Sequence, residues 1–319
     1  MTTTIIYTHA ACLEHRPGPH HPESPERLQA VVRALQAPEF AGLEWRDAPM
    51  GTVEQVRLIH DASFIDEIEQ SAPSQGYVPL DAGDTIMSPG SWEAVMRCVG
   101  AACAGVDAVM DGQARNVFCA TRPCGHHAEP ARAMGFCIFN QAAIAAAYAY
   151  DVHKLERVAV VDFDVHHGNG TQAAFFDRPE LFYASSHQSP FYPGTGARSE
   201  TGVNHNIVNV PLPRGCNSAQ FRAAMSALVF PALREFAPEL LILSTGFDAH
   251  RLDPLAGMNL EDTDFDWITR ELMQIADQTC DGRIVSILEG GYSLDALATS
   301  TAAHVSALMQ ASREGPEGP

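Results

Sequence analysis

The residues best suited to chemistry follow a short apolar run near the middle of the chain. The run 158–161 is uninterrupted Val-Ala-Val-Val, which is typical of a strand buried on both faces. Asp162, Asp164, His166 and His167 come directly after it. Because Asp164 and His166 are two positions apart, extended backbone would place both side chains on one side, where they could share an ion. Since buried charges need partners, the segment indicates a divalent metal site, although a polar turn with helix-capping aspartates is a simpler alternative.

Polar groups follow four other predicted strands in the same way. They are His126 with His127, Ser185 and Ser186 with His187, Asp248, and Tyr292. In open α/β sheets, ligands bind beyond the carboxyl ends of the strands. We therefore expect five separate segments to deliver polar side chains to one edge of a sheet.

Three possible metal ligands in this set, two carboxylates and one imidazole, are typical of a catalytic site. Asp164, His166 and Asp248 would leave one coordination position open, unlike a closed structural zinc site. An ion there would polarise a carbonyl and lower the pKa of water.

The remaining polar residues could supply proton transfer. His126 and His127 offer a general base and acid, and Asp162 is placed to orient one of them. Tyr292, after the flexible Gly290, could donate its hydroxyl to a developing oxyanion. These roles also have non-catalytic alternatives. The two adjacent histidines can be structural, and the Gly-Gly-Tyr sequence can form only a turn.

Alternating strands and helices are expected to position these groups. Strands are predicted at 4–7, 116–120, 158–161, 181–185, 240–244 and 283–288. Helices are predicted at 25–36, 92–110, 140–150, 218–236, 260–281 and 294–310, and a further helix begins at 52–55. The alternation predicts a parallel sheet with helices on both faces. The Pro/Gly-rich stretch 71–91 is long for a connection, which favours a function for it. We predict one domain over 1–319, with 312–319 disordered.

Composition narrows the class of protein. The 319 residues are 46% hydrophobic and carry a formal net charge of −19, which argues against nucleic acid as a partner. The acidity would attract cationic ligands, or it serves only solubility. The eight cysteines include no CxxC pair, which predicts reduced thiols. The sequence shows no basic leader and no run of 18 apolar residues, so we expect a cytoplasmic protein without a membrane span. The sequence does not determine the oligomeric state, and a homo-oligomer is possible.

Six motifs together resemble the zinc-dependent histone deacetylase family, whose bacterial branch includes acetylpolyamine amidohydrolases and histone-deacetylase-like amidohydrolases. In family order they are RPCGHHA (122–128), GFCIFN (135–140), VDFDVHHGNGT (161–171), FYPGTG (191–196), GFDAH with DPLAG (246–257) and EGGY (289–292). The resemblance implies the arginase-deacetylase fold, a three-layer α/β/α domain around an eight-stranded parallel sheet. It also implies removal of acetyl groups from lysine-type amines, either peptide-borne or in a small cationic substrate such as an acetylpolyamine.

The resemblance further implies roles for individual residues. Zn²⁺ would lie on Asp164, His166 and Asp248, with His126 and His127 moving protons and His127 the principal acid/base. Asp162 would support His126, and Tyr292 would polarise the scissile carbonyl. The substrate tunnel would include Gly135, Phe136, Tyr192 and Leu255. The residues around the site and its internal channel would include Arg27, Asn169 and Gly290. A structural K⁺ would lie near Ser185 and Ser186, together with Asp162, Asp164 and His166.

The chain departs from the family pattern at three positions. Asn169 stands where many members carry an aspartate, and a neutral partner raises the imidazole pKa less than a carboxylate does. Cys124 replaces a proline, and Tyr192 replaces a common phenylalanine. Leu255 occupies a position where polyamine-selective relatives place a glutamate, which favours a peptide-borne acyl-lysine. The early-loop carboxylates Glu23, Asp81 and Asp84 are the alternative rim for a polyamine.

Three rival functions are weaker. A binuclear manganese ureohydrolase needs further carboxylates where this chain has Gly168 and His250. A cysteine hydrolase would use Cys124 beside His126 and would be insensitive to chelators. A catalytically silent acyl-lysine-binding protein would be expected to have lost some of these polar residues, and the chain retains all of them.

Overall fold

The computed structural model describes residues 3–311, and its central feature is a parallel sheet of eight strands. The spatial order is β2-β1-β5-β10-β9-β6-β7-β8. The strands are β1 (Thr4–Thr8), β2 (Glu44–Asp47), β5 (Asn116–Cys119), β6 (Val158–Asp162), β7 (Leu181–Gln188), β8 (Ile207–Leu212), β9 (Leu240–Thr245) and β10 (Ile284–Leu288). All neighbouring pairs are parallel, which confirms the predicted eight-stranded α/β/α architecture.

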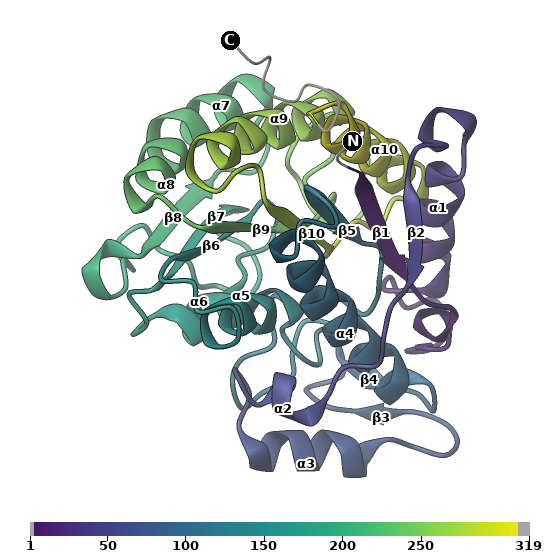
Figure 1. The fold of residues 1–319 in the computed structure, drawn as a ribbon. Coiled ribbons are helices and arrows are strands. Elements are labelled where there is room, and N and C mark those ends of the chain that lie inside the picture. The colour runs from purple at the N-terminus through teal and green to yellow at the C-terminus, as the bar shows by residue number, and fades with distance from the viewer. Residues whose placement is uncertain (1–2, 312–319) are drawn as a thin grey trace.

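Helices cover both faces of this sheet (Figure 1). One layer contains α1 (Pro25–Leu35), α7 (Ser218–Ala224), α8 (Phe230–Phe236), α9 (Asp262–Thr279) and α10 (Leu294–Ala311); the other contains α4 (Ser91–Met110), α5 (Gln141–Asp151) and α6 (Asn169–Phe175). The short α2 (Val53–Val56), α3 (Ala62–Ser71), β3 (Val78–Pro79) and β4 (Ile86–Met87) lie beside α4, and 3-10 turns cover Ala10–Leu13, Pro38–Phe40 and Val203–His205. Among the described residues, no helix is long and apolar enough to cross a membrane.

Strand β6 shows why the central run is apolar throughout. Ala159 and Val161 belong to the core beneath the α9 and α10 layer, whereas Val158 and Val160 belong to the core beneath α4 and α5. A strand covered on both faces needs apolar residues at consecutive positions. The buried strand can then hold Asp162 at its carboxyl end, next to β7 and β9.

The two strands that the residues alone did not indicate are the edge strands. β2 is Glu-Trp-Arg-Asp and largely exposed, so it has no hydrophobic pattern to recognise. β8 contains Pro211, which is tolerated at an edge because no further strand needs its missing N–H. A third correction concerns His187, which lies inside β7 and not after it, since that strand continues to Gln188.

One helical prediction and one loop prediction also need correction. The continuous helix expected over 218–236 contains a π-helical turn at Met225–Val229, just before Pro231, whose nitrogen cannot donate a hydrogen bond. The stretch 71–91, expected to be a loop, contains a small hairpin formed by β3 and β4. In its loop, the Asp81 carboxylate accepts hydrogen bonds from three backbone N–H groups. The predicted disorder of 312–319 lies outside the described residues.

Candidate active site

Asp164, His166 and Asp248 meet at the carboxyl ends of the adjacent strands β6 and β9. One ligand atom of each residue lies within 4.8 Å of the other two. His166 Nδ1 is 3.0 Å from Asp164 Oδ1 and 3.1 Å from Asp248 Oδ2. The spacing of Asp164 and His166 predicted their convergence, and the sheet order brings Asp248 to them.

Backbone groups fix the two carboxylates of this cluster. Gly290 N donates to Asp164 Oδ2 at 2.8 Å, and Val165 N donates to Asp248 Oδ1 at 2.8 Å. A Cβ at position 290 would overlap both carboxylates, so the close approach requires glycine. Two carboxylates and one imidazole, held so that their free atoms converge, fit a divalent ion such as Zn²⁺ with one position open.

His126 lies beside Asp162, as predicted. Its Nδ1 is 2.9 Å from Asp162 Oδ2, and the Tyr183 hydroxyl donates to the same oxygen at 2.9 Å. Burial opposes the charged imidazole, but the carboxylates of Asp162 and Asp164 outweigh burial and raise the pKa of His126 well above its ordinary value. Tyr183 had no sequence signal, because it lies within an apolar strand.

His127 has the opposite electrostatic environment. Burial, together with the nearby His126 and His166, lowers the pKa of His127 well below its ordinary value. Its Nδ1 lies 2.8 Å from Asn169 Oδ1, while Asn169 Nδ2 donates to Glu129 at 2.7 Å. Because the amide oxygen can only accept, His127 carries its hydrogen on Nδ1, and its Nε2 lone pair is free to take a proton.

Two carboxylates that the sequence analysis did not single out position these groups. Glu289 Oε2 accepts from Gly125 N at 2.7 Å and from His126 N at 3.2 Å. Asp253 Oδ2 accepts from Tyr292 N at 2.7 Å. Glu289 and Asp253 both lie in the motifs quoted above, and this could have marked them as site residues. The atoms that they contact could not be predicted from the sequence.

Tyr292 is held between a cation and an aromatic ring. The Arg27 guanidinium carbon lies 4.9 Å from the centre of the Tyr292 ring, and Arg27 Nε donates to Gly291 O at 2.6 Å. The Phe136 ring lies edge-on with its centre 5.9 Å away. Burial, followed by the neighbouring Cys124, raises the pKa of Tyr292 well above its ordinary value, so its hydroxyl remains a donor.

Aromatic rings border the imidazoles of His127 and His166. Gly135 has a φ of +57°, and a Cβ there would come within 2.5 Å of His127 and 3.0 Å of the Tyr192 hydroxyl. The Tyr192 ring is nearly perpendicular to that of His127, with centres 5.1 Å apart. Phe191, which the sequence analysis did not assign, stacks on His166 with centres 5.1 Å apart.

The expected rim carboxylates are mostly committed elsewhere. Glu23 is fully buried and bonds Arg27 at 3.1 Å and Arg122 at 2.7 Å, so it is not a rim residue. The Asp81 carboxylate is used by three hydrogen bonds from backbone N–H groups of its own loop. Asp84 and the 36%-exposed Leu255 remain at the surface.

The expected K⁺ region has one notable feature. Ser185 is the register partner of Asp162, and its Oγ lies 2.9 Å from His187 Nδ1. Ser186 Oγ is buried and has no hydrogen-bond partner within the described part of the chain.

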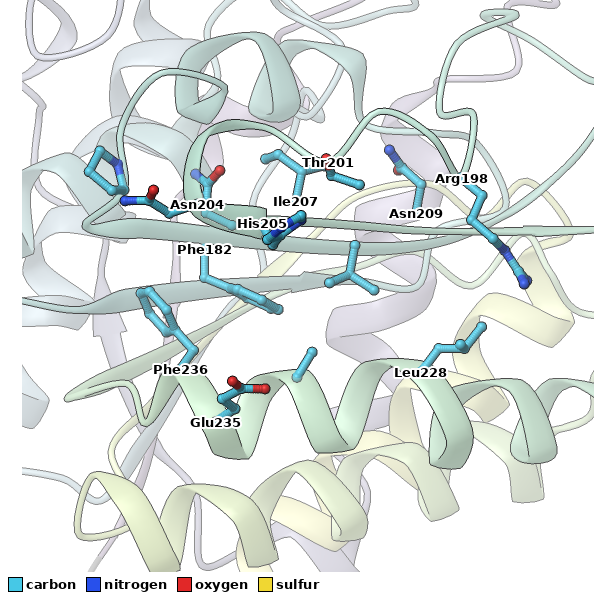
Figure 2. A pocket seen from close by; sticks show the side chains of 14 residues that line it. Phe182, Arg198, Thr201, Asn204, His205, Ile207, Asn209, Leu228, Glu235 and Phe236 are labelled. Atoms are coloured by element: carbon cyan, nitrogen blue, oxygen red, sulfur yellow. The ribbon is translucent and has the colours of Figure 1, made fainter.

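Two cavities differ in their relation to this cluster. One of about 680 Å³ is lined by residues of the early loops, including Arg16, His20, His21 and Tyr77, and Tyr292 is the one candidate site residue that contributes to its lining. Figure 2 shows another, of about 630 Å³, between β8 and α8 at the sheet edge. Phe182, Ile207 and Phe236 contribute to its lining, and none of the candidate site residues does, so the chemistry lies elsewhere.

The parallel sheet and the cluster at its carboxyl edge define an α/β protein with a candidate site for one metal ion. The histone deacetylase domain family matches residues 21–308. The chain is 36% identical to "Histone deacetylase 14, chloroplastic" of Arabidopsis thaliana, over 96% of this chain and 76% of the relative, and 36% identical to a "Histone deacetylase-like amidohydrolase" of Pseudomonas aeruginosa, over 91% and 82%. The crystal structure of the HDA15 HD domain superposes with a TM-score of 0.90 at 31% identity, covering 97% of this chain and 89% of that one. The chain belongs to the histone deacetylase family, and this membership supports a deacetylase-type amidohydrolase activity.

Proposed function

We propose that the chain is a zinc-dependent amidohydrolase that removes acetyl groups from lysine side chains. The observation that carries the proposal is the convergence of Asp164, His166 and Asp248 beside two histidines with oppositely shifted pKa values. These three residues would hold Zn²⁺, which when bound polarises a carbonyl and lowers the pKa of water.

The chain's own residues supply the proton transfers and orientation. His127 Nε2 takes the proton from water as its oxygen attacks the amide carbon, and the Asn169 oxygen keeps the imidazole in the required tautomer. The Tyr292 hydroxyl donates to the carbonyl oxygen as charge develops on it. The amine then leaves with a proton from the histidine pair, and acetate remains.

The neighbouring residues hold this arrangement in place. Asp162 stabilises the charged form of His126, which in turn favours the neutral form of His127. We also propose a structural K⁺ near Asp162, Ser185 and Ser186, where the carboxyl ends of β6 and β7 lie side by side. Its expected role is to fix the carboxyl ends of β6 and β7.

A peptide-borne acyl-lysine fits the rim better than a free acetylpolyamine. Recognition of a free polyamine needs carboxylates along the entrance, but Glu23 is buried and Asp81 is tied into its turn. Leu255 adds an apolar, half-exposed surface. Only Asp84 remains of the carboxylates expected there.

The test is to compare kcat/KM for an acetyl-lysine peptide and for N-acetylputrescine on zinc-loaded protein. We expect the peptide to be preferred by more than about tenfold, or roughly 1.4 kcal/mol in transition-state binding. Leu255→Glu should shift the preference toward the polyamine, whereas the neutral Leu255→Gln should not. A wild-type preference for N-acetylputrescine would overturn the substrate assignment and favour the acetylpolyamine alternative.

The remaining sequence-based expectations stay predictions. They are a single deacetylase domain, a cytoplasmic location, a possible homo-oligomer and no nucleic-acid partner. Relatives named as chloroplastic show that the family is not confined to one compartment. A silent acyl-lysine-binding protein would bind the peptide without releasing acetate, so the assay above also separates that alternative.

A further inference from the structure

Two cysteine thiols meet directly behind the catalytic-type residues. The Cys137 thiol donates to Cys124 Sγ across 3.4 Å, and the two side chains are 0% and 2% exposed. They belong to segments with different tasks. Cys124 lies in the loop that leads from β5 to His126, whereas Cys137 follows the turn formed by Gly135 and Phe136.

Each thiol is rigidly connected to part of the site. Cys137 pairs with Met134 through two backbone hydrogen bonds that close the Gly135-Phe136 turn. Cys124 immediately precedes Gly125, whose N–H, like that of His126, is held by Glu289. A covalent bond between the two sulfur atoms would therefore connect the tunnel wall to the histidine loop.

The surroundings favour sulfur–sulfur chemistry over a second metal ion. Glu289 lies close enough to both thiols to complete a three-ligand cluster. However, its carboxylate already accepts from Gly125 N, His126 N and Ser244 Oγ. The buried Arg27 guanidinium, which interacts electrostatically with Cys124, also disfavours another cation there.

A disulfide between Cys124 and Cys137 would place no additional positive charge near the Arg27 guanidinium. Burial, followed by the hydrogen bond to Cys124, raises the pKa of the Cys137 thiol well above its ordinary value, so Cys137 is uncharged at rest. A disulfide is uncharged as well. Cys124 is the less buried of the two, with 2% of its surface exposed.

We propose that Cys124 and Cys137 are an oxidation site that forms a reversible disulfide with hydrogen peroxide. The Cys124 sulfur attacks one peroxide oxygen, the O–O bond breaks, and Cys124 sulfenic acid and one water form. The Cys137 sulfur then attacks the sulfenic sulfur, the S–O bond breaks, and a second water leaves with the thiol proton. Peroxide is thereby reduced to two waters, and the dithiol is oxidised by two electrons.

Bond formation should impair turnover because the sulfur atoms must approach from 3.4 Å to about 2.05 Å. A shift of this size would move the histidine loop relative to the Gly135-Phe136 turn. Displacements near 1 Å at a catalytic site can cost about 10²-fold, so we expect kcat/KM to fall by at least about tenfold on oxidation. Dithiothreitol should restore it.

The experiment treats the zinc-loaded protein with hydrogen peroxide and follows two readouts. Mass spectrometry of digested, unreduced protein should show Cys124 joined to Cys137 with loss of two hydrogen atoms, which tests the bond independently of the proposed function. Activity on an acetyl-lysine peptide tests its effect. Cys124→Ala should prevent both changes while Cys216→Ala, which removes another buried thiol, should prevent neither.

Each contrary outcome is distinguishable. Absence of the cross-link under conditions that oxidise other cysteines would overturn the site. A cross-link without loss of activity would overturn its effect on turnover, and equal inactivation of Cys124→Ala would assign the loss to another residue. A second zinc that disappears in Cys124→Ala would make the pair metal ligands instead. If Cys124→Ala does not fold, Cys124→Ser serves the same purpose.

Discussion

Asp248→Ala is expected to abolish stoichiometric zinc binding and to lower deacetylation by about 10³-fold or more, because a catalytic ion contributes several kcal/mol to transition-state stabilisation. Asp248 is fully buried, and both of its oxygens are used, one toward Val165 N and the other toward His166. Removing the carboxylate therefore deletes a ligand and leaves His166 without one of its two acidic neighbours.

Zinc content, measured by plasma mass spectrometry beside the rate of acetate release, is the appropriate readout. Glu156→Ala, which removes an 83%-exposed surface carboxylate, is the control and should retain both properties. Asp248→Asn keeps a hydrogen-bond acceptor for Val165 N, and a thermal melt shows whether loss of activity comes from unfolding. An Asp248→Ala protein that still holds one zinc and turns over normally would refute the ligand assignment.

Tyr292→Phe is expected to lower kcat by about 10²–10³-fold, the usual effect of losing one oxyanion donor. The ring should stay in place, because Arg27 and Phe136 contact the ring and Asp253 holds the backbone N–H. Zinc content should be unchanged. The variant thus separates carbonyl polarisation from metal binding.

Tyr192→Phe provides a matched control for this prediction. It removes a hydroxyl from the wall beside His127 but leaves the proposed oxyanion donor intact. We expect its kcat to stay within a few-fold of wild type, as is common for interactions outside the reacting centre. Equal losses in the two variants would contradict a special role for Tyr292.

The sequence predicted much of the site because parallel strands have a simple geometry. Asp162 ends an apolar strand, and Asp164 and Asp248 each follow one. Strands that share a direction present their carboxyl ends together. Their position at one edge could therefore be expected, whereas the contact of Asp248 with the other two depends on β6 and β9 being neighbours. The same logic misplaced His187, because nothing in its local sequence marks the extension of β7 to Gln188.

What could not be predicted depends on contacts between distant segments. The orientation of Asn169, and hence the tautomer of His127, depends on Glu129, 40 positions earlier. The rim prediction for Glu23 was wrong because its partner Arg122 lies 99 positions away and draws the carboxylate into the interior. Edge strands such as β2 also lack a hydrophobic pattern, since one of their sides has no neighbour.

The most direct test of zinc-dependent deacetylation is the rate of acetate release from an acetyl-lysine peptide by one preparation in three states. The protein is measured as zinc-loaded, after removal of metal with a chelator, and after addition of one equivalent of Zn²⁺ per chain. We predict that activity is lost with the metal and returns with that single equivalent. Unchanged acetate release by the metal-free protein would contradict the central claim.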